Sequence, residues 1–134
     1  MKTIVPVLSF VLLSLVWSCG EKKQDNQALY DEVMKVHDEV MPKMDDIYKL
    51  KQELKKQIAD TPNLVDEKRR TIEATILKLD SASEAMMVWM RNFNPLPDSL
   101  GEEKAREYLE DQQEKIKKVK DEMLDAINKA SELN

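Results

Sequence analysis

A chain of 134 residues with 42% hydrophobic and 35% charged residues has the size of one compact domain and suits helices with one apolar face. Two glycines and 5% aromatic residues leave little material for the turns and packed faces of a β architecture, so the composition favours an all-α fold. The net charge of −5 argues against nucleic acid as a partner, because phosphates require a basic surface.

The beginning of the chain has the layout of a secretion signal. A basic start is followed by an apolar stretch from Ile4 to Trp17, and Ser18 precedes the only cysteine, Cys19. The apolar stretch is shorter than the roughly 20 residues that a permanent membrane helix needs. We therefore expect residues 1–18 to be a signal peptide that is removed from the mature protein.

The residues Val16-Trp17-Ser18-Cys19 resemble the lipobox of bacterial lipoproteins. The resemblance implies that the Cys19 thiol carries a diacylglycerol and that the new amino terminus receives a further acyl chain such as palmitate. Several acyl chains hold a protein on a membrane much more firmly than one chain does. Gly20, which follows the cysteine, resembles the sorting signal for the outer membrane, where the protein would face the periplasm or the cell surface. A secreted protein with an unpaired thiol is the alternative.

The remaining chain divides into a short polar segment and three helical segments. Residues 19–27 are expected to be the lipidated cysteine and its tether, because they lack an apolar period. Residues 28–134 are expected to form an antiparallel three-helix bundle, up-down-up and coiled-coil-like. Breaker-rich turns around Pro62 and Pro95 separate its helices and favour a monomer, while a dimeric or longer coiled coil is the alternative.

Apolar residues at three- and four-residue spacings, or multiples of these, mark the expected buried face of each segment. The first face comprises Leu29, Val33, Val36, Val40, Met44, Ile47, Leu54 and Ile58. The second comprises Val65, Ile72, Ile76, Leu79, Met86, Met90 and Phe93. The third comprises Ala105, Leu109, Gln112, Ile116, Val119, Met123, Ala126, Ala130 and Leu133, with Gln112 as its polar member.

Two positions predict local features of these helices. Pro42 lies inside the first segment and removes the hydrogen bond to the Asp38 carbonyl, so we expect either a kink or two separate helices. Ser99 followed by Glu102 has the capping-box spacing and predicts the start of the third helix.

Six methionines gather in two strings, one around His37 and one around Trp89. These strings are Met34, Met41 and Met44, and then Met86, Met87 and Met90. With a turn near Pro62, antiparallel pairing places Met34 level with Met90. The same register places His37 level with Met87. The two strings are therefore expected to meet.

Thioether sulfur and imidazole nitrogen are donors that Cu(I) and Ag(I) accept. An alternative function is therefore a soft-metal-binding or envelope-stress lipoprotein, and this ligand usage resembles that of periplasmic copper and silver handling proteins. Its candidate ligands are Met34, His37, Met41, Met87 and Met90. The simpler interpretation is that flexible methionines fill an irregular helical core, in which case the protein has no cofactor besides the lipid on Cys19.

Enzyme chemistry has little support in the sequence. There is no second histidine, no Gly-rich loop, and no nucleophile with a base at readable spacing. We therefore expect a non-enzymatic, lipid-anchored protein of the cell envelope that serves as a scaffold or protein-binding module for an envelope partner. A lipid-handling protein whose amphipathic helices open is a further alternative.

The stretches HDEVMPKMDDIYKLKQEL and MMVWMRNF are similar to those of a group of small bacterial lipoproteins labelled viral A-type inclusion protein. The resemblance covers most of residues 26–95. It implies no viral role and no activity, and it brings no catalytic or binding residues with it.

Overall fold

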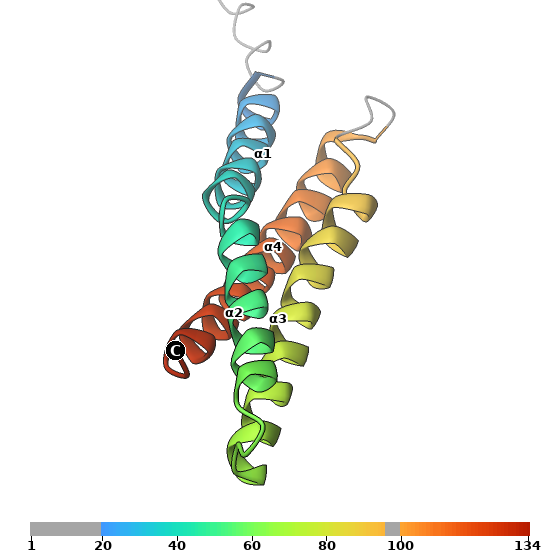
Figure 1. The fold of residues 1–134 in the computed structure, drawn as a ribbon. Helices are drawn as coiled ribbons and strands as arrows, with labels where there is room; N and C mark the ends of the chain where they lie inside the picture. Colours follow the sequence, from blue (N-terminus) through green and yellow to red (C-terminus); the bar gives the residue numbers. More distant parts are fainter. Residues whose placement is uncertain (1–19, 96–99) are drawn as a thin grey trace, which may run out of the picture.

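The structure is a computed structural model that describes residues 20–95 and 100–134, and all of its regular structure in these ranges is α-helical (Figure 1). The helices are α1 (Gly20–Val40), α2 (Lys43–Asp60), α3 (Asp66–Asn92) and α4 (Glu102–Ser131). α1 and α2 follow one another as a single bent rod, α3 returns antiparallel to it, and α4 runs parallel to the rod. The predicted all-α, up-down-up bundle is confirmed, with the first of its three rods divided in two.

α4 is the helix that the other three share. α1 and α3 both pack mainly against α4, and α2 packs against α3 and α4 alike. The buried residues of α4 are Ala105, Leu109, Gln112, Ile116, Val119, Met123, Ala126 and Ala130. They agree with the predicted third face, of which Leu133 alone is half-exposed. The uninterrupted repeat of α4 therefore supplies the centre of the core.

The rod formed by α1 and α2 also buries its predicted face. Val33, Val40, Ile47 and Leu54 are fully buried, and the remaining members of that face are half-buried. α1 begins at Gly20, so the residues expected to form a tether up to position 27 are helical. This stretch contains no Pro and is rich in Glu, Lys and Gln. These residues have high helix propensity, so a helix that already packs further along the chain can continue through them at a small cost in free energy.

A tertiary contact holds the early part of α1 against α4. Asn26 is 5% exposed, and its Nδ2 donates to the Glu102 carbonyl oxygen at 2.9 Å and to the Glu102 carboxylate at 3.1 Å. The first turn of α4 is thereby tied to α1. The predicted signal peptide over residues 1–18 and the predicted lipid site at Cys19 lie outside the described residues.

The helical path breaks between α1 and α2 at Met41 and Pro42. The Met41 N–H still donates to the His37 carbonyl at 2.9 Å, whereas Met44 and Asp45 donate to carbonyls only three residues back, at 3.1 and 3.2 Å. Pro42 itself keeps helical backbone angles, with φ −61° and ψ −23°. Of the two outcomes predicted for Pro42, two separate helices is the one observed.

α3 follows its predicted face except at its start. Ile72, Leu79 and Met86 are fully buried, but Val65 is 70% exposed. The expectation for Val65 was wrong because this residue precedes the helix with an extended backbone (ψ 134°), so the helical period does not apply to it. α3 also buries Trp89, which the predicted face omitted.

The start of α4 differs from the predicted capping box. The helix begins at Glu102 and its N-cap is Gly101, which makes no side-chain capping bond. Ser99, the expected cap, lies outside the described residues. Among the helices that the structure describes, none has both the length and the apolar character needed to cross a membrane.

Polar side chains fix the alignment of the helices at the surface. Three hydrogen bonds with a common sequence separation of 81 residues join the rod to α4 and to the chain end that follows it. Their partners are Gln113 and Glu32, Lys120 and Glu39, and Asn134 and Glu53. The first two lie before Pro42 and the third lies after it, so the rod keeps one register with α4 across the break.

Two ion pairs align α3 with its neighbours. Lys51 of α2 lies 2.6 Å from Asp80, and Lys78 pairs with Asp125 of α4. Hydrogen bonds from Lys78 and Lys129 lower the pKa of Asp125, and the bond to Asp125 raises the pKa of Lys78. Both pairs are consistent with an antiparallel course of α3.

Candidate functional site

Five rings connect α1, α3 and α4 near the end of the bundle that contains the α4 N-terminus. The centroid distances are 6.1 Å for Tyr30 and Phe93, 5.7 Å for His37 and Trp89, and 6.3 Å for Phe93 and Tyr108. Trp89 stacks on Phe93 at 4.7 Å. We call these five residues the aromatic column. Since α1 and α3 separate toward this end of the bundle (Figure 1), large rings form the contact between them.

The position of Trp89 in the column leaves its indole N–H without a hydrogen bond. The side chain is 6% exposed, and Nε1 has no partner among the described residues. A buried donor without a partner costs about 1–3 kcal/mol. The indole N–H of Trp89 is therefore the least favourably placed polar group in the column. It could donate to a further group that carries an acceptor.

Asp38, the next residue in the sequence, holds the His37 ring in place. Its Nδ1 lies 2.9 Å from Asp38 Oδ1, and its side chain is 18% exposed. A carboxylate at Nδ1 favours the tautomer with the proton on that nitrogen, so Nε2 is left as the unprotonated donor atom of the ring. The imidazole is thus oriented and partly shielded from water.

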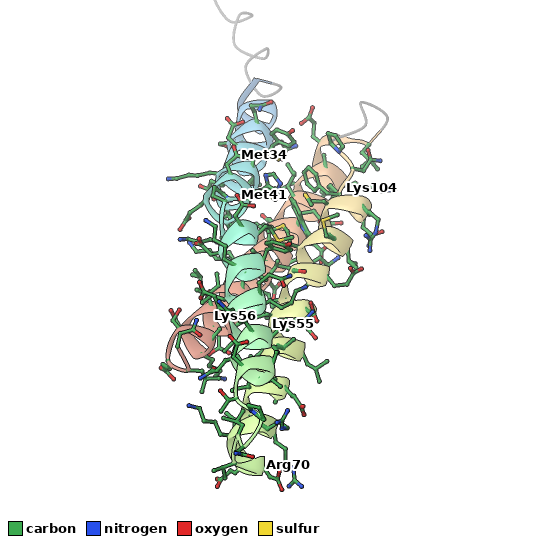
Figure 2. The ribbon with its side chains drawn as sticks, in the orientation of Figure 1. Met34, Met41, Lys55, Lys56, Arg70 and Lys104 are labelled. Carbon is green, nitrogen blue, oxygen red and sulfur yellow. The ribbon has the colours of Figure 1, made fainter. Side chains whose placement is uncertain are left out.

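The predicted methionine ligands fall into two groups. Met34 is half-buried, and Met41 and Met90 are half-buried and pack against the core. Figure 2 shows Met34 on α1 and Met41 at the break that follows this helix. Met87 is 40% exposed and forms no part of the core. The structure therefore packs Met90, but not Met87, against the core.

The register of α1 with α3, together with the rotation of α3 about its axis, explains why Met90 is packed and Met87 is exposed. Along α1, Met34 falls between Tyr30 and His37, and along α3, Met90 falls between Trp89 and Phe93. The predicted level pairing of Met34 with Met90 agrees with these contacts. His37 contacts Trp89 instead of lying level with Met87, because α3 presents Trp89 inward and Met87 to solvent.

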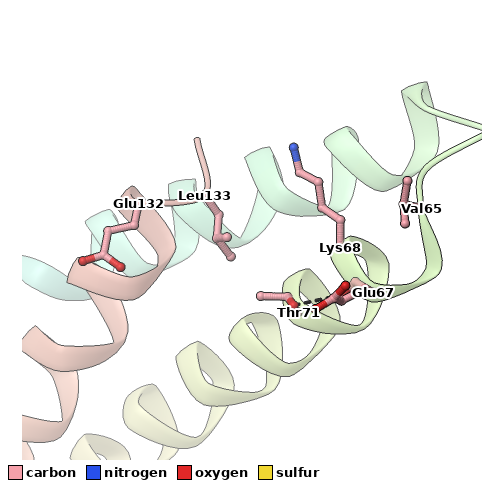
Figure 3. A pocket seen from close by; sticks show the side chains of 6 residues that line it. All are labelled: Val65, Glu67, Lys68, Thr71, Glu132 and Leu133. Carbon is pink, nitrogen blue, oxygen red and sulfur yellow. Dashed lines mark hydrogen bonds between the residues drawn. The ribbon is translucent and has the colours of Figure 1, made fainter.

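A recess of 470 Å³ lies at the opposite end of the bundle, where the start of α3 meets the end of α4 (Figure 3). Its lining residues are Val65, Glu67, Lys68, Thr71, Glu132 and Leu133. The Thr71 hydroxyl already donates to the Glu67 carbonyl at 2.9 Å. The recess thus offers a mixed, open surface and no set of polar groups directed at one point.

Acidic and imidazole groups do not form a metal cluster in the part of the chain that the structure describes. No group of three or more His, Cys, Asp or Glu side chains is close enough to hold an ion there. Thioether sulfur is a further class of metal donor, and methionines lie on both sides of His37 in the sequence.

Sequence reasoning missed the contribution of Tyr108 to the column. Its hydroxyl accepts a hydrogen bond from the Asn94 N–H at 2.8 Å, which ties α4 to the chain that leaves α3. Tyr108 precedes the buried Leu109, and such a position beside a core residue suits an aromatic ring with a polar tip. Comparison of the chain with protein-family models, curated proteins and solved structures finds no match.

Proposed function

We propose that the chain is a lipid-anchored protein of the cell envelope that acts without catalysis as a scaffold or protein-binding module. Lipid on Cys19 would attach it to the outer membrane, facing the periplasm or the cell surface. The proposal depends on the signal-like first residues together with one feature of the fold.

That feature is the start of α1 at Gly20, the residue that follows the expected lipid site. The rod runs from Gly20 to Asp60 and, at 1.5 Å per residue, extends about 60 Å. With helix directly after the lipidated cysteine, the bundle would stand on the membrane with little slack. Such a rod suits a spacer that holds a partner at a defined distance from the bilayer.

The half of the bundle that lies beyond Pro42 carries candidate contacts for a protein partner. Tyr48, Val65 and Leu77 are large apolar side chains that are exposed, and all lie beyond the Pro42 break as counted from Gly20. Exposed apolar side chains offer surface that a protein partner can remove from water. The partner would then engage the membrane-distal half of the bundle.

The lipid anchor is tested by expressing the full chain in its native host with a palmitate analogue that can be labelled. We expect label and membrane association for the natural chain, and neither for Cys19→Ser. Mass spectrometry should find a product that begins at the modified Cys19. An unmodified polypeptide that still begins at Met1 would refute the anchor.

The scaffold role is tested by placing a photocrosslinking amino acid at Leu77, with Lys104 as the matched exposed control. Lys104 lies at the other end of the bundle, beside the start of α4 (Figure 2). We expect one defined crosslinked envelope protein from Leu77 and none from Lys104. Equal crosslinking from both positions, or none from either, would contradict a binding role for the distal half.

A further inference from the structure

We propose that Met34, His37 and Met90 form a binding site for a soft monovalent cation, Cu(I) or Ag(I), which Trp89 closes from within the core. Met41 is the fourth donor in reach of the same site. The inference is independent of the lipid anchor and of any protein partner. It rests on the face of α1 that Met34 and His37 share, on the contacts of this face with α3, and on the chemistry of the donors.

Two of the donors, Met34 and His37, lie on one face of α1, and Met41 follows directly after the last residue of that helix. Met34, His37 and Met41 are separated by three and four residues, a spacing that brings helical side chains next to one another. The contact between His37 and Trp89 fixes this face toward α3. Thioethers therefore lie on both sides of the imidazole, along the helix axis, and face the second helix.

Met90 reaches the same level from α3. The ring contacts of Tyr30 with Phe93 and of His37 with Trp89 bracket Met34 on one helix and Met90 on the other. Both methionines are half-buried, so their sulfur atoms lie at the edge of the core and not in open solvent. A cation between the two helices would then receive sulfur from each of them.

The imidazole is oriented as a metal ligand requires. Asp38 occupies Nδ1 at 2.9 Å, which leaves Nε2 as the coordinating nitrogen. Histidine ligands commonly hold a carboxylate or carbonyl at the other ring nitrogen, which fixes the ring and raises its basicity. His37 thus resembles a ligand with its supporting carboxylate already in place.

The donor set selects the class of metal. One imidazole nitrogen with two or three thioether sulfurs matches the preference of Cu(I) and Ag(I). Ca²⁺ and Mg²⁺ require oxygen ligands, and Zn²⁺ sites are built from thiolate, imidazole and carboxylate, so these ions fit poorly.

Trp89 forms the inner wall of the proposed site. Its side chain is more than nine-tenths buried, yet Nε1 has no hydrogen-bond partner among the described residues. The indole ring lies 5.7 Å from the His37 ring, centroid to centroid, and an aromatic π face attracts positive charge when water is excluded.

The test uses the full chain in detergent with the background substitutions Trp17→Phe and Cys19→Ser. These leave Trp89 as the only tryptophan and remove the only thiol, which would otherwise bind the probe. The chain is titrated with Ag(I), and with Cu(I) under reducing conditions against a coloured chelator. We expect saturation at one equivalent together with a change in Trp89 fluorescence, and no such response to Zn²⁺.

Substitutions then separate a site from unspecific thioether binding. His37→Gln, Met34→Leu and Met90→Leu should each weaken binding by about tenfold or more, in the range known for altered metal sites. Leu has nearly the volume of Met, so the fold should persist, and thermal unfolding checks this. Met87→Leu is the matched control, because Met87 is exposed on the same helix, and its affinity should stay within about twofold.

Two results would overturn the proposal. The first is the absence of saturable binding by a folded chain. The second is an equal effect of Met87→Leu and Met90→Leu, which would indicate binding to surface thioethers in general. If His37→Gln unfolds the chain, the two Met→Leu variants and their Met87 control decide the question on their own.

Discussion

Replacing Pro42 by alanine should stabilise the fold, although the residue stands where the rod bends. The hydrogen bonds from Gln113 to Glu32 and from Asn134 to Glu53 have the same separation of 81 residues, and they lie on opposite sides of Pro42. The break therefore neither adds nor removes a residue relative to α4. A continuous helix could keep the same partners, so the bend follows from the proline and is not required by the register.

The magnitude follows from the costs of proline in a helix. Proline is about 3 kcal/mol less favourable than alanine in a helix interior, which includes the lost hydrogen bond to the Asp38 carbonyl. Alanine gives up about 0.4–1 kcal/mol because it leaves the unfolded chain freer than proline does. The net stabilisation of Pro42→Ala should be about 2 kcal/mol, which for a domain of this size raises Tm by about 8 °C.

Thermal and urea unfolding of the full chain, followed by circular dichroism, measures this change. Pro62→Ala is the control, because Pro62 lies in the connection between α2 and α3 and its replacement should not raise Tm. A fall in stability for Pro42→Ala would refute the reasoning. It would show that Val40 and Ile47 can reach α4 together only through the bend.

Three further substitutions test other features of the core and surface. Leu79→Ala, at a fully buried position, should lower the free energy of unfolding by about 2–5 kcal/mol, and a loss below about 1 kcal/mol in urea unfolding would contradict the assigned core. Gln112→Leu should raise it by about 1 kcal/mol, since this buried side chain donates only to the neighbouring Asp111 carboxylate at 2.9 Å; a lower urea midpoint would contradict this. Asp125→Asn should destabilise the fold at pH 7, because the folded pKa of Asp125 is lowered by Lys78 and its contribution is present above the unfolded value of about 3.9. The difference between this variant and the natural chain should vanish as the pH falls through the folded pKa, and urea midpoints that differ equally at pH 7 and about pH 2 would show that the charge plays no part.

The face of α4 was predictable because one physical rule governs it along its whole length. Its repeat from Ala105 to Ala130 has no breaker, and three helices cover it, so every apolar position on that face becomes buried. Pro42 was predictable for a similar reason, since the missing N–H acts locally and does not depend on the rest of the fold.

Features that depend on tertiary contacts could not be predicted from the hydrophobic pattern of the sequence. The start of α1 has no apolar period, and its order is connected to the bond between Asn26 and Glu102, which are 76 residues apart. Six apolar residues in succession, from Ala85 to Met90, leave the inward direction of α3 undefined until the contact with His37 fixes it. The pairing of Met34 with Met90 needed only the position of a turn, whereas the exclusion of Met87 needed the rotation of the helix.

The topology has a consequence for the order of assembly during synthesis. α2 and α3 are neighbours in the sequence and can form a hairpin as soon as both have left the ribosome or the translocation channel. The principal partner of α1 is α4, which is made after all the others, so the first helix to emerge is completed last. Such distant pairing slows folding and leaves the apolar face of α1 exposed in the interval, when a chaperone could bind it.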